Sequence, residues 1–513
     1  MKKTETKNKI LDLDRVEEKL KKLKKLKKKI VHCHGVFDLL HIGHLKHFQS
    51  AKKYGDILIV SITPNKFVFK GANRPYFDEQ ERLEALASIE VIDFVVLNNY
   101  PDSIEIIKKI RPHYYCKGPD YSGLEKKSSS AVKNNKNFVN EKKICKKINC
   151  IIKLTADIKF SSSKIINEKL LDFNKKENSF ISNIKKNYTL RDIEKKIDDL
   201  SKLNLVVIGD PIIDTYLFSD SLGVSSKSSI VSTQLMYEEN YMGGSFAVAE
   251  MLSKLGCSID LLAYKSKDKF FSKQISLLDK KIKFLNISYQ KRIPRISRFV
   301  HRNRNEKLFQ FYEFDKFLHT KKSLSEFSKL LSKKNNKKHV IIIDFGFGFL
   351  DKKMINILEK KVNNFSLNVH ANSLNSNFNK FTKYKKYNYL SMNKKEFQLG
   401  LNTAENDIDL LVKEAKQNKI NYPFAVTLGP LGSIFVEKKT KQFSPTFFQK
   451  TIDTVGSGDA FFAITSALNK LGKDSLLTSF IGNIYAGLHT LNVGNKKFVS
   501  KEELKNSIKQ ILN

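Results

Sequence analysis

Tryptophan is absent from this chain, which has only 5 cysteines and 10 prolines among 513 residues. The cysteines are irregularly spaced and form no C-x-x-C pair, which argues against a disulfide framework and against a paired-cysteine metal site. No run of about 18 apolar residues occurs, so we expect no membrane-spanning helix. The lysine-rich residues 1–29 lack the apolar core of a secretion signal, so we expect a cytoplasmic protein.

Negative charge is also scarce, because 92 basic residues face 53 acidic ones and the net charge is +39. Such an excess is found in nucleic-acid-binding proteins, but it also concentrates anionic small substrates. Here the lysines are spread through every segment, without basic and aromatic interleaving. We therefore expect phosphate-bearing small molecules as partners and no specific nucleic acid. A basic nucleic-acid-binding protein is kept as the weakest alternative.

The length exceeds that of one ordinary core, so two to four domains are expected. Short apolar runs alternate with helical patterns, which predicts βαβ units and parallel sheets. Residues 10–29 have leucines at helical spacing and predict a surface helix. The apolar runs that predict strands include 57–62, 94–97, 206–209, 341–344 and 424–428.

Polar, lysine-rich residues between the two halves predict a linker. The predicted fold class is α/β, with two doubly wound parallel-sheet domains. We place the first domain at 28–172, the linker at 173–202 and the second domain at 203–513.

Residues 35–46 read Gly-Val-Phe-Asp-Leu-Leu-His-Ile-Gly-His-Leu-Lys and join a predicted strand to a predicted helix. The start of a helix presents free amides and partial positive charge to phosphate groups. His41 and His44 can donate hydrogen bonds to a triphosphate, and Lys46 adds a cation. Removing one such donor costs about 3 kcal/mol of transition-state stabilisation. The alternative is a pair of ordinary core histidines.

This segment resembles the cytidylyltransferase-like nucleotidyltransferase family over about residues 28–170. The resemblance implies a Rossmann-like domain in which His41, His44 and Lys46 are catalytic. The H-I-G-H tetrad also occurs in class I aminoacyl-tRNA synthetases, but no second signature or anticodon-binding module follows it. The implied nucleotide and phosphate contacts are Gly35, Phe37, Lys70, Arg74, Arg82, Lys117, Asp120, Ser161, Ser162 and Ser163. The three serines alone would be an ordinary helix cap.

Residues 453–460 read Asp-Thr-Val-Gly-Ser-Gly-Asp-Ala before a helical pattern. Gly456, Ser457 and Gly458 can turn successive backbone N–H groups toward a phosphoryl group. Asp459 can accept the proton of an attacking hydroxyl. The alternative is a glycine-rich turn that Asp459 merely caps.

This second segment resembles the signature of the ribokinase-like (PfkB) sugar kinases. The resemblance implies a kinase domain with a small β lid, bound ATP and Mg²⁺, and a monovalent cation near Asp453. Residues 298–311 resemble the strand region that follows the lid. The implied roles are substrate binding for Asp210, Asp214, Gly243, Gly244 and Arg298, metal binding for Asn393 and Glu396, and nucleotide binding for Thr427 and Gly429. Asn393 and Glu396 alone would be an ordinary helix start.

Both domains together resemble the bifunctional heptose-phosphate kinase/adenylyltransferases, with the domain order reversed. Residues 368–372, Asn-Val-His-Ala-Asn, are similar to a related group of nucleotidyltransferase–PfkB fusions. The chain departs from the usual pattern at Asn65, where an acidic residue is usual, and at Ala247, where Asn is usual.

The resemblance implies a bifunctional enzyme of nucleotide-sugar synthesis, of the ADP-heptose type used for surface polysaccharide. One domain would phosphorylate a sugar or sugar phosphate with ATP. The other would transfer AMP or CMP from ATP or CTP to a sugar phosphate and release pyrophosphate. An alternative is one active domain beside a regulatory or scaffolding one, and a homo-oligomer is left open.

Overall fold

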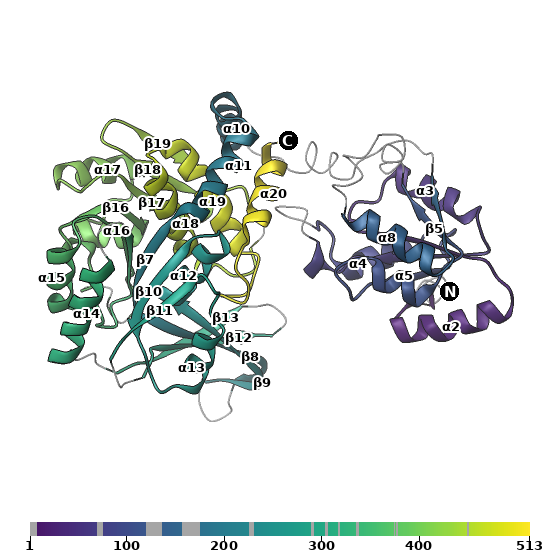
Figure 1. The fold of residues 1–513 in the computed structure, drawn as a ribbon, viewed down its shortest axis with the longest axis horizontal. Helices are drawn as coiled ribbons and strands as arrows, with labels where there is room; N and C mark the ends of the chain where they lie inside the picture. The colour runs from purple at the N-terminus through teal and green to yellow at the C-terminus, as the bar shows by residue number, and fades with distance from the viewer. Residues whose placement is uncertain are drawn as a thin grey trace. The chain divides into compact units, whose positions relative to one another are not determined.

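The computed structural model describes residues 8–68, 75–118, 136–155, 175–224, 230–288, 292–302, 306–315, 319–334, 338–373, 375, 378–448 and 451–512. The chain folds into two compact units, Met1–Asp172 and Phe173–Asn513. Each unit has its own sheet and its own helices (Figure 1). The predicted α/β fold with two parallel-sheet domains is confirmed.

The first unit is built on a six-stranded parallel sheet. Its strands in spatial order are β1 (Ile10–Leu11), β4 (Phe94–Leu97), β3 (Ile57–Ile62), β2 (Ile30–Gly35), β5 (Tyr114–Lys117) and β6 (Ile151–Leu154). The strand order reverses between β2 and β5, and ligands of open α/β sheets bind at the carboxyl ends of the strands at such a point. The described helices are α2 (Leu13–Lys25), α3 (Ile42–Lys52), η1 (Asn65–Phe67), α4 (Glu79–Ala87), α5 (Ile104–Ile110) and α8 (Lys136–Lys147).

The N-terminal segment is part of this first core. Its residues 10–11 form strand β1, which pairs with β4, so the predicted helix begins only at Leu13. Helix α2 buries Val16 and Leu20 in one core cluster with strand residues such as Ile30. The apolar stripe of this lysine-rich helix therefore covers one face of the sheet, and the unit extends the predicted domain toward the N-terminus.

The second unit contains a nine-stranded sheet whose first seven strands are parallel and whose last two are antiparallel. The spatial order is β11 (Ile282–Ile287), β10 (Ser258–Tyr264), β7 (Asn204–Gly209), β14 (His339–Asp344), β15 (Phe365–Val369), β16 (Tyr387–Asn393), β17 (Phe424–Thr427), β18 (Ser433–Val436) and β19 (Lys441–Ser444). The inner strands are mostly apolar and buried, as expected for a parallel sheet with helices on both faces, whereas the edge strands β11 and β19 are partly exposed.

Helices and short 3₁₀ turns connect these strands. In chain order they are α10 (Lys175–Asn187), α11 (Leu190–Asp199), η4 (Leu200–Lys202), α12 (Ser245–Lys254), α13 (Lys269–Ser276), α14 (Lys321–Lys334), α15 (Lys352–Lys361), η5 (Phe381–Lys383), α16 (Lys394–Leu401), α17 (Ile408–Gln417), η6 (Gly429–Leu431), α18 (Ser457–Leu471), α19 (Ser475–His489) and α20 (Lys501–Leu512). Within the described residues of either unit, no helix is both long and apolar enough to cross a membrane.

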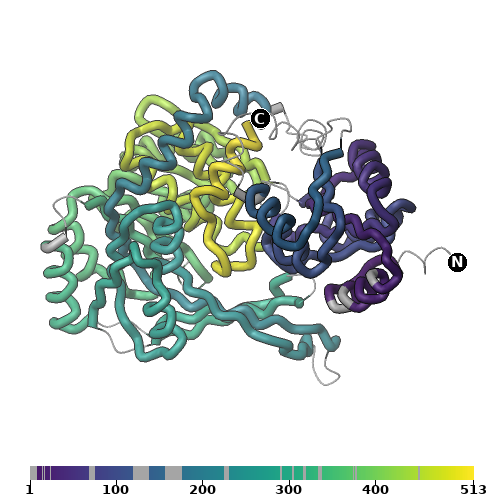
Figure 2. The backbone as a smooth tube through the Cα atoms, turned by 45° about the vertical axis from the view of Figure 1, so that its right-hand side comes forward, coloured from purple at the N-terminus to yellow at the C-terminus, as the bar shows by residue number. Residues whose placement is uncertain are grey.

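A second, four-stranded sheet forms the lid of this unit. Its order is β13 (Lys307–Glu313), β12 (Arg295–His301), β8 (Pro211–Val224) and β9 (Val231–Gly244). The long strands β8 and β9 extend away from the nine-stranded sheet, as the teal part of Figure 2 shows. Residues 298–311, which were predicted to follow the lid, contribute strands β12 and β13 to the lid itself. The parallel pairing of β12 with β8 explains this difference, since it joins segments distant in the chain.

Much of the predicted linker belongs to the second unit. The Phe180 ring of α10 lies 6.2 Å from the rings of both Phe447 and Phe480. The Tyr188 hydroxyl donates a 2.8 Å hydrogen bond to Asp474, and Ile193 of α11 is fully buried. Lys176, Lys185 and Lys186 of α10 and Lys195 of α11 are exposed, on the sides of two amphipathic helices that composition alone did not reveal.

We predict that separate chains of residues 1–172 and 173–513 both fold. A matched cut after Tyr188 should destabilise the second fragment, because it removes α10 and the burial of Phe180 and Ile184. Burial of each such side chain contributes about 1.5–3 kcal/mol. Urea unfolding followed by circular dichroism measures the difference. Equal stability after the two cuts would contradict the packing of α10, and two insoluble fragments would contradict independent cores.

Candidate active sites

The first candidate site lies where strand β2 passes into helix α3. Gly35 ends β2, and the buried Phe37 has a positive φ of 48°, which turns the chain toward the helix. His41 caps α3, and its Nδ1 accepts a 3.1 Å hydrogen bond from the Gly43 N–H. The predicted strand–loop–helix is therefore present, and its turn lies at the carboxyl edge of the sheet.

The predicted catalytic residues His41, His44 and Lys46 share the first turns of α3. The imidazole rings of His41 and His44 are stacked, with centroids 4.0 Å apart and an interplanar angle of 19°. The Phe37 ring meets the His44 ring edge-on at 5.3 Å. This packing fixes the orientation of the two partly exposed rings, so both present nitrogen atoms near the start of a helix.

Arg82 connects three loops around this turn. Its guanidinium donates hydrogen bonds to the carbonyl oxygens of Val36 (2.6 Å), Thr63 (2.9 Å) and Phe77 (3.1 Å) and to Asn65 Oδ1 (2.7 Å). The side chain is 1% exposed. In the structure Arg82 holds the loops that follow β2 and β3 and the loop that precedes α4, and its contact with a phosphate stays a prediction.

Lys117, another predicted phosphate-binding residue, ends strand β5 and pairs with a buried carboxylate. Its ammonium lies 2.8 Å from Glu141 Oε1, and both residues are buried. The Ser103 and Tyr115 hydroxyls donate to the same oxygen. A buried ion pair needs such additional hydrogen bonds to offset its desolvation. The pair anchors α8 to the sheet next to the point where the strand order reverses.

Two histidines that the sequence analysis did not single out lie beside this point. His32 Nε2 and His34 Nδ1 are each 2.8 Å from Ser61 Oγ, and His34 Nε2 is 3.4 Å from Thr63 Oγ1. Burial, together with the positive charge of Lys117, lowers the pKa of His34 to about 3. His34 is therefore a neutral hydrogen-bonding group. The H-C-H alternation on a strand was the signal that could have identified the pair.

Six predicted contacts of this first site lie outside the described residues. They are Lys70, Arg74, Asp120, Ser161, Ser162 and Ser163.

The second candidate site is centred on the start of helix α18. Gly456 is the N-cap and has a φ of 78°, a conformation that favours glycine. A Cβ at this position would also lie 2.9 Å from His489 Nε2. Ser457 and Gly458 begin the helix, and the Ser457 N–H donates to the Thr454 carbonyl at 3.2 Å. The start of a helix is where backbone N–H groups lack partners within the helix and can receive an anion.

Asp459 lies in the first turn of α18 and is held by a histidine that directly follows strand β15. His370 Nε2 is 2.8 Å from Asp459 Oδ1, and His370 Nδ1 is 3.2 Å from Glu396 Oε1. The imidazole also stacks on the Phe345 ring at 4.2 Å. Burial alone would lower the pKa of His370, but the carboxylates of Asp459 and Glu396 outweigh burial and raise it to about 10. His370 is thus an imidazolium bridging two buried carboxylates.

Asp214 and Arg298 form a second buried pair nearby. Arg298 donates a 2.5 Å hydrogen bond to Asp214 Oδ1, and a side chain at Gly243 would collide with the same carboxylate. Burial raises the pKa of Asp214 and Arg298 opposes this, while the charges of Asp459 and Asp453 raise it further. Asp214, Asp453 and Asp459 therefore lie close enough for the charges of Asp453 and Asp459 to raise the pKa of Asp214.

Asp210 directly follows β7. Burial raises its pKa to about 7, and the nearby Asp344 carboxylate raises it in the same direction. Its Oδ2 accepts a 3.3 Å hydrogen bond from the Phe345 N–H. Gly244, with a φ of 61°, lies against the Asp210 carbonyl, so these two predicted contacts share the base of the lid.

Asn393 and Glu396 form a capping box at the start of α16, as the ordinary interpretation of this pattern expects. Glu396 Oε2 accepts from the Asn393 N–H at 3.0 Å, and Oε1 accepts from the Ala371 N–H at 3.2 Å. Thr427 is the register partner of Asn393 on β17, and Gly429 follows it. No group of three or more His, Cys, Asp and Glu side chains gathers as a metal cage in the described parts of the chain.

Asp453, near which a monovalent cation was expected, is bound to a lysine of the lid. The Lys307 ammonium lies 2.5 Å from Asp453 Oδ1, and the Tyr216 hydroxyl donates to Oδ2 at 2.7 Å. The Val455 and Gly494 N–H groups each donate to the carboxylate at 3.0 Å. This donor set fits a monovalent cation poorly, because Lys307 already supplies a positive charge there.

The two units match different protein families. Residues 32–168 match the family described as cytidylyltransferase-like. Residues 202–494, more than half of the 513 residues, match the pfkB family of carbohydrate kinases.

Several similar proteins are described as bifunctional protein HldE. The one from Aliarcobacter butzleri is 39% identical over 118 residues, which cover 23% of this chain and 25% of that protein. The one from Campylobacter fetus is 36% identical over 154 residues, covering 29% of this chain and 33% of that protein. The chain thus spans only about a quarter to a third of these relatives. A ribokinase structure from Thermotoga maritima has a TM-score of 0.46 and 18% identity, covering 60% of this chain and 99% of that one.

We predict that Lys307→Met lowers the melting temperature and makes it depend on potassium. The substitution leaves the buried Asp453 carboxylate without its cation, and a loss of 1 kcal/mol lowers Tm by about 1–2 °C for a unit of this size. Thermal unfolding in potassium chloride and in tetramethylammonium chloride at equal ionic strength measures the effect.

Lys496→Met, which removes an exposed pair with Glu239, is the control and should change little. The wild type should melt at the same temperature in both salts. Potassium stabilisation of the wild type as large as that of Lys307→Met would show that a cation site exists beside Lys307.

Proposed function

We propose that this chain, which belongs to the pfkB family of carbohydrate kinases, is a bifunctional enzyme of nucleotide-sugar synthesis. The second unit would transfer the γ-phosphoryl group of ATP to a sugar or sugar phosphate. The first unit, which is cytidylyltransferase-like, would transfer AMP or CMP to a sugar phosphate. The observation that carries the proposal is that Asp459 lies in the first turn of α18, directly after the N-cap Gly456 and the residues Ser457 and Gly458.

In the kinase step, Asp459 accepts the proton of the substrate hydroxyl as its oxygen attacks the γ-phosphorus. The bond from that phosphorus to the bridging oxygen breaks, and ADP leaves. The amides at the start of α18 face the negative charge of the transferring group, where preorganised donors stabilise a transition state. His370 Nε2 lies 2.8 Å from Asp459 Oδ1 and holds this carboxylate in position.

Substrate recognition is assigned to the paired charges at the base of the lid. Asp214 can accept hydrogen bonds from sugar hydroxyls, and Arg298 fixes its orientation from 2.5 Å away. Gly243 leaves the approach to this carboxylate open. These groups suit a polyhydroxylated substrate, and an ADP-heptose-type pathway is the specific case that we propose.

Mg²⁺ would arrive with ATP and supply charge neutralisation of the phosphates. Magnesium is usually held by one or two carboxylates together with substrate phosphates, so a complete protein cage is not required. Glu396 is the buried carboxylate that fits this requirement beside Asp459. Thr427 and Gly429, at the end of the neighbouring strand, are proposed to contact the nucleotide.

In the nucleotidyl step, an oxygen of the sugar phosphate attacks the α-phosphorus of ATP or CTP. The bond from the α-phosphorus to the oxygen that bridges it to the β-phosphorus breaks, and pyrophosphate leaves. His41, His44 and Lys46 would stabilise the charge that develops on pyrophosphate. Neutral His34, held by Ser61 and Thr63, would line this site without adding charge. Arg82 keeps the surrounding loops in position.

The partners under this proposal are small sugar phosphates and nucleotides. We propose the cytoplasm as the location, because both reactions consume nucleoside triphosphates. Homo-oligomerisation is neither required nor opposed by this mechanism.

Asp459→Asn is predicted to remove most kinase turnover. The amide cannot accept the hydroxyl proton, and general-base catalysis contributes about 10²–10⁴ in rate. ATP affinity should change little, because the amides of α18 remain. ADP release over a panel of sugars and sugar phosphates measures turnover, and the exposed Asp409→Asn is the matched control. Wild-type turnover in Asp459→Asn would remove Asp459 from the role of base.

His44→Ala is predicted to slow pyrophosphate release about 10²–10³-fold. ADP formation should persist, because Asp459 lies in a separate unit with its own core. Pyrophosphate and ADP are assayed separately, and Lys53→Ala, an exposed change at the end of α3, is the control. Parallel loss of both activities in folded His44→Ala protein would contradict two independent sites.

A further inference from the structure

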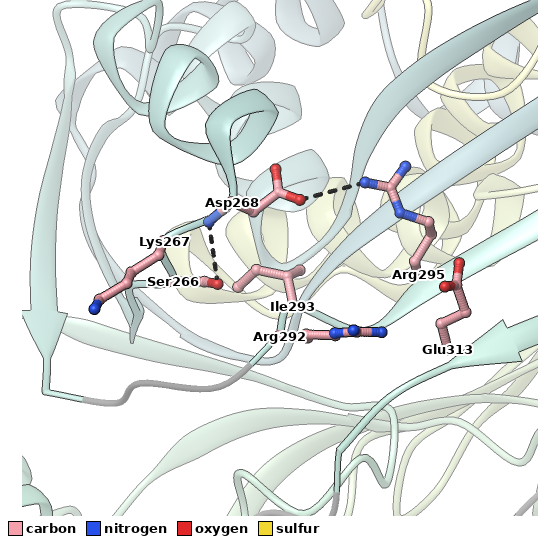
Figure 3. A pocket seen from close by; sticks show the side chains of 7 residues that line it. All are labelled: Ser266, Lys267, Asp268, Arg292, Ile293, Arg295 and Glu313. Atoms are coloured by element: carbon pink, nitrogen blue, oxygen red, sulfur yellow. Dashed lines mark hydrogen bonds and ion pairs between the residues drawn. The ribbon is translucent and has the colours of Figure 1, made fainter.

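A pocket of about 340 Å³ lies at the base of the lid. Figure 3 shows that three segments line it: the connection between β10 and α13, the chain entering β12, and the end of β13. Ile293 is 3% exposed and Ser266 is 7% exposed, so apolar and polar groups are both built into the walls. The volume is in the range of small-molecule sites.

The pocket lies on the opposite face of the lid from the proposed sugar site. Side chains alternate between the two faces of a strand. Arg298 is the register partner of Tyr216 and shares a face with Asp214. Arg295 hydrogen-bonds to Thr215, the next residue after Asp214, at 2.8 Å, which places it on the other face.

Positive charge is available in the pocket. Neither the Arg292 guanidinium nor the Lys267 ammonium has an ion-pair partner among the residues that the structure describes. Arg295 is held 3.4 Å from Asp268 and 2.9 Å from Asn240 Oδ1. The pocket therefore combines a fixed arginine with two cations that can pair with an incoming anion.

Two further polar groups of the pocket, Glu313 and Ser266, can hydrogen-bond to the hydroxyl groups of a ligand. Glu313 is the register partner of Arg295 and lines the same wall. The buried Ser266 oxygen accepts a 3.4 Å hydrogen bond from the Asp268 N–H and still has a proton to donate. A carboxylate and a hydroxyl over the apolar surface of Ile293 are groups that bind the rim and face of a sugar ring.

From this geometry we propose that the pocket is a second carbohydrate site, specific for a sugar phosphate monoester. The phosphate would bind Arg292, whose planar guanidinium matches phosphate oxygens bidentately, and Lys267 would add a second charge. The sugar hydroxyls would bind Glu313 and Ser266. The site is separate from both proposed active sites and does not depend on their activities.

Arginine footprinting on the full chain tests this proposal. Phenylglyoxal labelling of individual arginines is followed by peptide mass spectrometry, with glucose 6-phosphate, inorganic phosphate or glucose as the probe. Labelling of Arg292 should slow about tenfold when glucose 6-phosphate exceeds its dissociation constant about tenfold. Inorganic phosphate should require higher concentrations, and glucose should have no effect. Arg191, exposed on α11, is the internal control.

Lys267→Gln should shift the protection of Arg292 to higher glucose 6-phosphate, whereas the exposed Lys280→Gln should not. Protection of Arg298 in the same samples reports binding at the proposed sugar site of the kinase unit. The proposed site would be overturned if Arg298 alone were protected. It would also be overturned if the labelling rate of Arg292 changed only in parallel with that of Arg191. Equal protection of Arg292 by inorganic phosphate would overturn the assignment to a sugar ester.

Discussion

Charge neutralisation of buried carboxylates organises the second unit. Asp214, Asp453 and Asp459 lie near the carboxyl edge of the large sheet, and each is bound to a basic side chain. Leaving a buried charge without its partner costs about 3–5 kcal/mol. Arg298 and Lys307 both come from lid strands, so these ion pairs connect the lid to Asp214 and Asp453. The same contacts orient the groups to which we assign substrate binding.

His370 extends this principle to the proposed base. The single imidazolium of His370 contacts both Asp459 and Glu396, and its ring is stacked on Phe345. Asp210 is different, since burial and a second carboxylate raise its pKa to about 7. The edge of the sheet thus contains carboxylates paired with a basic side chain and another, Asp210, for which protonation relieves the cost of burial.

Local patterns predicted the elements well and the long-range partners poorly. Strands 57–62 and 94–97 have the predicted bounds, because apolar runs of this length between polar turns identify buried strands. The glycine turn before Asp459 was also recognisable locally. His370 and Lys307 were missed as partners because they are 89 and 146 positions from the aspartates they bind. No local spacing encodes such contacts.

The lysine-rich composition obscured other features. It predicted a linker where α10 and α11 present apolar faces to the second core, and a surface helix where β1 and α2 complete the first. The family resemblance implied a phosphate contact for Arg82, which stays a prediction, and in the structure its donors hold three loops together. In each case burial decides the role, and burial follows from the tertiary arrangement.

The central claim is that one chain contains two independent phosphate-transfer sites. The most direct measurement incubates the wild-type chain with Mg²⁺, ATP or CTP, and a panel of sugars, sugar phosphates and sugar 1-phosphates, with ADP and pyrophosphate assayed separately. If the two sites are independent, some substrates should yield ADP without pyrophosphate and others pyrophosphate without ADP. A single product across the whole panel, or two products that always rise together, would contradict it.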